Sequence, residues 1–170
     1  MTFKILTDST ADLPESWALE NDVQILGLTI QLDGTTYETV GDKKLTSEQL
    51  LSKMEAGSQP TTSQINVGQF EDIFRGYAEI GMPVLYIAFA SVLSGTYQSA
   101  VMARDMVLED FPEAVIRIID TKAASMGEGI LVMKAVEAKA AGQSLEQVVA
   151  LIKSLVPKVK TYFLVDDLNH

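Results

Sequence analysis

Short apolar runs alternate along the chain with longer stretches that carry the start and stop signals of helices. The runs have the length of β-strands. The run at residues 83–90 is almost continuously apolar, which is typical of a parallel strand buried on both faces. The predicted strands lie at residues 3–7, 23–32, 35–39, 83–90, 115–119 and 161–165.

Capping signals fix where several helices begin. A Ser, Thr or Asn followed three residues later by Gln can satisfy two free backbone N–H groups at a helix start. Three such pairs are Thr46 with Gln49, Asn66 with Gln69, and Ser144 with Gln147. Gly142 is a typical helix stop. The predicted helices lie at about residues 15–21, 46–56, 66–80, 94–109, 126–141 and 144–156.

The order of these elements predicts an α/β fold with a mostly parallel sheet and helices on both faces. The pair Asp33-Gly34 is a strong turn signal, so we expect a β-hairpin near residues 23–39. The chain has no internal repeat, low-complexity segment or linker, which favours a single α/β domain over residues 1–170. The predicted strand at 161–165 has little after it to cover its carboxyl end. We therefore expect the N-terminal part of a longer protein.

Composition and charge exclude several functions. The formal net charge of −10 comes without a basic stripe, so nucleic acid is not an expected partner. Cysteine is absent, which excludes disulfides, thiolate nucleophiles and zinc knuckles, and agrees with a cytoplasmic location. The N-terminus does not resemble a signal peptide. No apolar stretch approaches the roughly 20 residues of a membrane span.

The only histidine is the last residue, His170. A Ser–His nucleophile, a phosphohistidine or a histidine metal site cannot be built within the body of the chain. We expect no catalytic residue, no metal and no cofactor.

Two hydroxyl-rich segments are the main candidates for ligand binding. They read QPTTSQ at residues 59–64 and SVLSGTYQS at residues 91–99, and the second follows the apolar strand at 83–90. A segment between a parallel strand and its helix lies at the carboxyl end of the sheet, where α/β proteins bind ligands. Helix N-termini offer free N–H groups to anions. The pattern predicts a small acidic head group held by neutral donors.

Each candidate also has a structural interpretation. Asp8, Asp120, Asp166 and Asp167 end predicted strands and could converge on Mg²⁺, but Asp also forms turns and helix caps. Ser94-Gly95 could be a nucleophile elbow, although it lacks the G-x-S-x-G pattern and a base, and Ser94 is also a good N-cap. The two threonines after Pro60 could lie in a solvated loop. Methionines at helical spacing are typical core filler.

These segments give the chain a resemblance to a known family. The chain resembles the DegV family of bacterial fatty-acid-binding proteins over essentially its full length. The matching motifs are DSTADLP at 8–14, PTTSQ at 60–64, LSGTYQSA at 93–100, DTK at 120–122 with Gly127 and Gly129 following, and FLVDDL at 163–168.

The resemblance implies a non-catalytic carrier that encloses a long-chain fatty acid and presents its carboxylate to a separate fatty acid kinase subunit. In that family two hydroxyls bind the carboxylate, and they map onto Thr62 and Ser94. Ser9, Thr61 and Gly95 are second-tier candidates in the same motifs. The family's Gly/Arg-rich motif and C-terminal domain are absent here, and residues 38–42 differ from the usual acidic loop.

Two other functions remain open at this point. One is an enzyme of phosphoryl or acyl transfer on a related dihydroxyacetone-kinase-like α/β scaffold, a class that needs an internal histidine. The other is a scaffold domain without a ligand.

Overall fold

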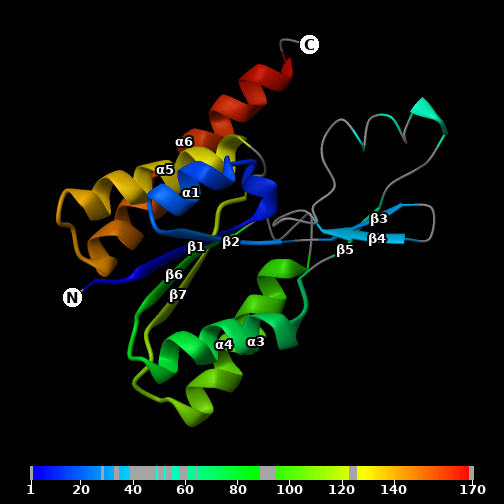
Figure 1. Cartoon of the computed structure of the whole chain (residues 1–170). Coiled ribbons are helices and arrows are strands. Elements are labelled where there is room, and N and C mark those ends of the chain that lie inside the picture. The colour runs from blue at the N-terminus through cyan, green and yellow to red at the C-terminus, as the bar shows by residue number, and fades with distance from the viewer. Residues whose placement is uncertain are drawn as a thin grey trace.

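The protein is described from a computed structural model, in which two sheets and their helices are resolved (Figure 1). The described residues are 2–27, 29–32, 35–38, 49, 52, 55–57, 61–63, 65–88, 95–122 and 126–168. Residues 29–32, 35–38, 61–63, 126 and 160–168 are described by their backbone.

A four-stranded parallel sheet forms the centre of the fold, with strand order β2-β1-β6-β7. Its strands are β1 (Lys4–Asp8), β2 (Val23–Leu26), β6 (Val84–Ala88) and β7 (Ile116–Asp120). Every neighbouring pair is parallel, so all four carboxyl ends lie at the same edge. The predicted α/β class is confirmed.

A second, three-stranded antiparallel sheet has the order β4-β3-β5. Its strands are β3 (Thr29–Leu32), β4 (Thr35–Glu38) and β5 (Thr61–Ser63). The hairpin is confirmed, because β3 and β4 pair on either side of Asp33-Gly34, which lies outside the described residues. The single strand expected at 23–32 is wrong. It divides near Gly27 into β2 and β3, which belong to different sheets, and glycine weakens a strand interior.

Helices cover both faces of the parallel sheet, as predicted (Figure 1). One face carries α1 (Glu15–Glu20), α5 (Met126–Ala140) and α6 (Leu145–Leu168), and the other carries α3 (Val67–Glu79) and α4 (Thr96–Asp110).

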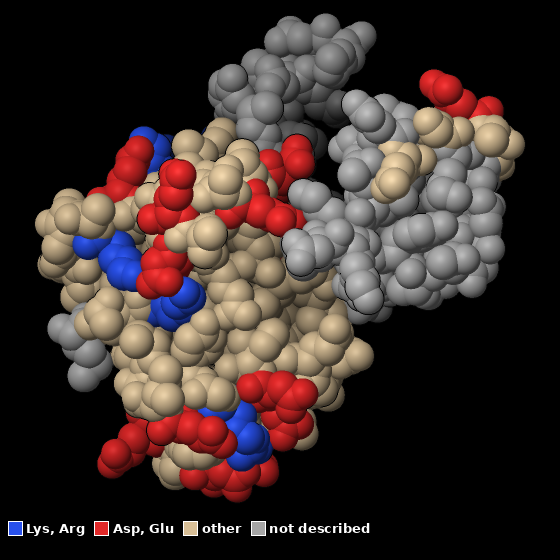
Figure 2. All heavy atoms as spheres, viewed as in Figure 1, with Lys and Arg blue, Asp and Glu red and all other residues tan. Residues whose placement is uncertain are grey.

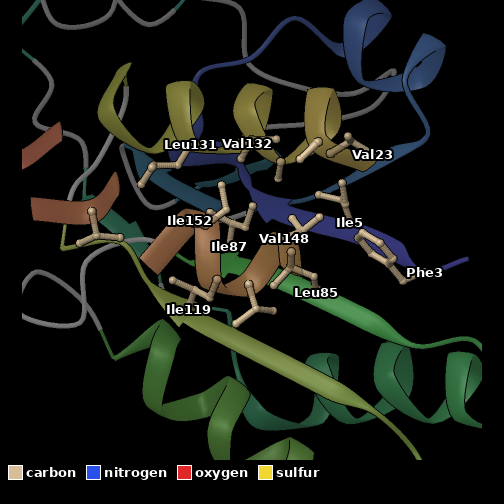
Figure 3. Close-up of a cluster of buried hydrophobic side chains, with 14 of the residues drawn as sticks. Phe3, Ile5, Val23, Leu85, Ile87, Ile119, Leu131, Val132, Val148 and Ile152 are labelled. Atoms are coloured by element: carbon tan, nitrogen blue, oxygen red, sulfur yellow. The ribbon is translucent and has the colours of Figure 1, made fainter. Parts of the chain in front are cut away.

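Strand β6 supplies both halves of the hydrophobic core. Successive side chains of a strand point to opposite faces. Leu85 and Ile87 therefore pack with the helices of one face, among them Ile152 of α6 (Figure 3). Val84 and Tyr86 pack on the α3–α4 face. All four of these strand residues are fully buried, which explains the nearly continuous apolar run.

The capping boxes confirm two predicted helix starts. At α3, the Gln69 amide donates to Asn66 Oδ1 at 2.9 Å, and the Asn66 amide donates to Gln69 Oε1 at 3.0 Å. Ser144 and Gln147 make the same pair of bonds before α6, at 2.8 and 3.2 Å. The predicted helix at 46–56 lies mostly outside the described residues. Gln49, Ser52 and Glu55 have helical backbone there.

The strand expected at 161–165 is wrong, because these residues continue α6 to Leu168. The helix passes through Pro157, which lacks a backbone N–H. A helix satisfies its backbone hydrogen bonds internally, whereas a strand needs a neighbour. None of the described strands pairs with this run. Within the described part of the chain, no helix combines the length and hydropathy needed to cross a membrane.

Candidate functional site

The described residues of the candidate segments lie at or near the carboxyl edge of the parallel sheet. Ser9 begins the short 3₁₀ helix η1 (Ser9–Ala11) directly after β1. Gly95 precedes α4, on the connection that follows β6. The second sheet, which contains Thr61 and Thr62, lies beyond this edge (Figure 1). Three of the motifs therefore belong to one end of the molecule.

Thr62 lies in a strand rather than in the loop that we expected. In β5 its backbone is opposite Ile30 of β3. The Thr61 backbone is opposite Gln31 of the same strand.

The start of α4 also differs from the prediction. Gly95 is the N-cap residue, with φ −77° and ψ 2°, and as a glycine it has no side chain to cap the helix. The first helical residue is Thr96, which is fully buried. Ser94 lies outside the described residues, so its contact with a carboxylate stays a prediction, as does its meeting with Thr62.

A buried polar cluster lies at the same edge and was not expected from the sequence. Its first member is Asp8, at the end of β1. Asp8 Oδ1 accepts from the Thr10 amide at 3.2 Å and from the Thr10 hydroxyl, and Asp8 Oδ2 accepts from the Tyr86 hydroxyl at 2.6 Å. The bonds to Thr10 confirm the interpretation of Asp8 as a turn and cap residue.

The second carboxyl of the cluster is Glu128, in the first turn of α5, and it is fully buried. The Thr10 hydroxyl lies 2.6 Å from Glu128 Oε1, and the Thr7 hydroxyl lies 2.8 Å from Glu128 Oε2. Burial, followed by the negative charge of Asp8, raises the pKa of Glu128 to about 10. Burial and the same carboxylates also raise the pKa of Tyr86 well above its usual value.

Gly129 explains how Glu128 reaches this position. A Cβ at Gly129 would lie only 2.8 Å from the Ala11 carbonyl oxygen, so α5 approaches the η1 backbone more closely than any side chain permits. The chain leaves η1 through Asp12, whose φ is 56° and whose amide donates to the Ser9 carbonyl. The glycine thereby brings the preceding glutamate against the β1–η1 turn.

A signal for this cluster was present in the sequence. Gly127 and Gly129 belong to the motif that we noted, but the acid between them was overlooked. Glu128 is the one charged residue among the first eight of α5, and the glycine on each side of it lets backbone approach closely.

The alternative of a magnesium site loses its basis. Asp166 and Asp167 lie in α6 and do not end a strand. Asp120 Oδ1 accepts from the Lys122 amide at 2.9 Å, as a turn residue does. Among the described residues no group of three or more acidic or histidine side chains is arranged to hold a metal ion.

Acidic side chains lie in several regions of the visible face, the upper helices included (Figure 2). Figure 2 shows acidic side chains at the end formed by α3 and α4, with basic ones among them. Arg75 donates to Glu71 at 3.0 Å and to Asp110 at 2.8 Å. The expectation that nucleic acid is not a partner stays a prediction.

Comparisons with curated proteins give close relatives. A DegV domain-containing protein from Streptococcus pyogenes is 56% identical over all 170 residues, and one from Lactococcus lactis is 45% identical over the same length. The chain covers 59% of each of these two proteins, so it spans about three fifths of their length.

Solved structures share the fold. A fatty acid (stearic acid)-binding protein from Eubacterium ventriosum has a TM-score of 0.82 and 32% identity, covering 89% of this chain and 52% of that one. A DegV family protein from Thermus thermophilus, described by its fatty acid binding, has a TM-score of 0.80 and 34% identity, covering 92% and 54%. The family model described as "Uncharacterised protein, DegV family" matches residues 2–170. The chain belongs to the DegV family.

Proposed function

We propose that this chain binds a long-chain fatty acid without catalysing a reaction, and that the Thr62 and Ser94 hydroxyls hold its carboxylate. The carboxylate is then presented to a separate fatty acid kinase subunit, which forms the acyl phosphate. Ser9, Thr61 and Gly95 are the neighbouring candidates for head-group contacts.

The observation that carries this proposal is the likeness to two fatty-acid-binding structures that have TM-scores of 0.82 and 0.80 and identities of 32% and 34%. Both contain the fold described above over about nine tenths of this chain. The chain covers little more than half of each, so part of a binding tunnel can come from a further domain.

The geometry favours the carboxyl edge of the parallel sheet as the head-group site. The amides at the start of α4 follow Gly95 and favour a negative charge. The β5 strand brings the Thr62 backbone into the sheet that lies beyond the carboxyl ends of β1 and β6 (Figure 1). A ligand between these elements would meet neutral hydroxyl and amide donors.

The free energies indicate that the acyl tail would contribute most of the affinity for a fatty acid. Burying about fourteen methylenes at ~0.8 kcal/mol each gives an upper bound of roughly 11 kcal/mol. A hydrogen bond to a charged group adds about 1.5–3 kcal/mol. The tail would set the affinity, and the hydroxyls would set the orientation.

Neutral donors also suit transfer to a kinase. An arginine clamp would hold the carboxylate charge more strongly and would oppose its conversion. The only histidine, His170, is at the end of the chain, so Ser94 has no internal histidine as a general base. We therefore expect no ester hydrolysis and no ATP turnover that depends on Ser94.

Calorimetry with oleate and palmitate tests binding directly. Heat of binding is expected for this chain and stronger binding for a full-length relative, because the additional length of the relative can complete the tunnel. If neither protein bound either fatty acid, the carrier proposal would be wrong. Ester or ATP turnover lost in Ser94→Ala would favour the transferase alternative.

A double-mutant cycle tests the residue pair. Thr62→Val keeps the side-chain shape and removes the donor, so oleate binding should weaken about tenfold with little change in melting temperature. Thr36→Val, in β4 of the same sheet, is the matched control and should bind normally. Combined with Ser94→Ala, Thr62→Val should show a coupling energy. Independent effects would mean that the two hydroxyls do not share one carboxylate.

A further inference from the structure

Around Glu128, the Thr7 and Thr10 hydroxyls make four contacts with acceptor oxygens of the described residues but bring only two protons to fill them. The Thr7 hydroxyl is 2.8 Å from Glu128 Oε2 and 2.9 Å from the Ile87 carbonyl oxygen. The Thr10 hydroxyl contacts Glu128 Oε1, at 2.6 Å, and Asp8 Oδ1. Each hydroxyl has one proton to donate but faces two acceptors.

A proton on Glu128 fills one of the two remaining contacts. If Thr7 donates to the Ile87 carbonyl, which can only accept, a protonated Glu128 can donate to the Thr7 oxygen. If the proton lies on Oε1 instead, Thr10 can donate to Asp8 and accept from Glu128, so the single proton fills one of these two contacts at a time. With Glu128 ionised, two of these contacts bring unprotonated oxygens together in a buried site, one more than with the proton present, which is costly.

We propose that Glu128 is a neutral carboxylic acid in the folded protein, that its proton takes part in the hydrogen bonds of this cluster, and that it positions the β1–η1 turn beside the head-group site. The positioning part rests on the proposed function. The assignment of the proton to Glu128 does not rest on the proposed function.

The surroundings of Glu128 agree with this assignment. The titratable groups that face it are Asp8 at the end of β1 and Tyr86 in β6, while η1 contributes the Thr10 hydroxyl. Burial and the Asp8 charge both act against ionisation and raise the pKa of Glu128 to about 10. Gly129 lets α5 lie close to the Ala11 carbonyl, and Glu128 beside it is fully buried.

The consequence for the ligand is electrostatic and geometric. Ser9 lies between Asp8 and Thr10, and β1 is the neighbour of β6, which leads towards Gly95. A neutral Glu128 leaves this edge with one negative charge fewer, which favours the approach of an acyl carboxylate. Its hydrogen bonds also hold the turn that carries Ser9 in place.

The proton is tested by stability measurements at several pH values. The folded-state pKa is raised, so the stability that the proton contributes is lost as pH rises from the unfolded towards the folded value. Glu128→Gln keeps the size and stays neutral. The ratio of its folding equilibrium constant to that of the parent should rise up to tenfold per pH unit between about pH 6 and pH 9.

Glu146→Gln is the matched control, because Glu146 also lies in the first turn of a helix, but its side chain is 64% exposed. Its ratio to the parent should not change over this range. A constant ratio for Glu128→Gln would overturn the proposal. If that variant does not fold, carboxyl-carbon NMR of the parent decides: Glu128 should keep the signal of a protonated acid at pH 7, and an ionised signal would overturn it.

Oleate binding tests the positioning part. Glu128→Ala should weaken binding about tenfold, as expected for a lost buried hydrogen bond, and Glu128→Gln should restore most of it. Equal binding by Glu128→Ala and the parent would overturn the positioning role. If the parent bound no oleate, the proposed function would fail, while the pH ratio and the NMR signal would still decide on the proton.

Discussion

Replacing Gly129 by alanine measures how closely α5 must approach η1. The added Cβ would lie 2.8 Å from the Ala11 carbonyl oxygen and 3.4 Å from Leu13 Cδ2. The first contact is shorter than real Cβ atoms show, and the obstacle is backbone, which cannot turn aside. Either the helix or the 3₁₀ turn must shift. Overpacking of this kind costs about 1–3 kcal/mol.

Gly76 provides a matched control within α3. A Cβ there would meet nothing within 4 Å, so alanine should bring only its higher helix propensity, about 1 kcal/mol. Both substitutions gain that propensity, and it cancels when they are compared. Gly129→Ala should therefore be less stable than Gly76→Ala by about 1–3 kcal/mol.

Urea unfolding and thermal melting of the two variants are the assays. At roughly 2–4 °C per kcal/mol for a protein of this size, Gly129→Ala should melt about 2–12 °C below Gly76→Ala. A shifted helix would also move Glu128 away from Thr10, so the carboxyl-carbon NMR signal of Glu128 should change in this variant alone. Equal melting temperatures would refute the close approach of α5 to η1.

Two further changes test individual contacts. Asn66→Ala removes the side-chain half of the α3 capping box and should cost about 1 kcal/mol in urea unfolding, and Asn66→Asp should recover most of it. Tyr86→Phe removes the donor to Asp8 Oδ2 and should cost about 1.5–3 kcal/mol. Because the pKa of Tyr86 is raised, its phenolate absorbance should be missing from the parent's alkaline titration until the protein unfolds. A loss of less than 0.5 kcal/mol, roughly the effect of a surface substitution, would contradict either contact.

The local pattern of the sequence determined most of the elements. The continuous apolar run predicted β6. The capping pairs beginning at Asn66 and Ser144 predicted the starts of α3 and α6, and the turn signal Asp33-Gly34 predicted the pairing of β3 with β4. These features depend on residues within a few positions of one another, so the sequence contains the whole interaction. The family motifs then indicated the region of the site.

Features that depend on distant partners were decided by the tertiary structure. Residues 23–32 became two strands because β2 pairs with β1 while β3 pairs with β4 and β5. Thr62 lies in a strand because β3 offers it a partner. The apolar run at 161–165 remains in α6, where a helix needs no partner strand.

The Glu128 cluster shows the same division most clearly. The printed sequence places Glu128 more than a hundred residues from Thr7 and Thr10, and nothing local links them. Their contact arises because β1 ends beside the start of α5 and because Gly129 lets the two backbones meet. Burial and the neighbouring carboxyl then set the proton affinity of Glu128. Residue identity supplied the acid, and only the packed fold determined that the acid keeps its proton.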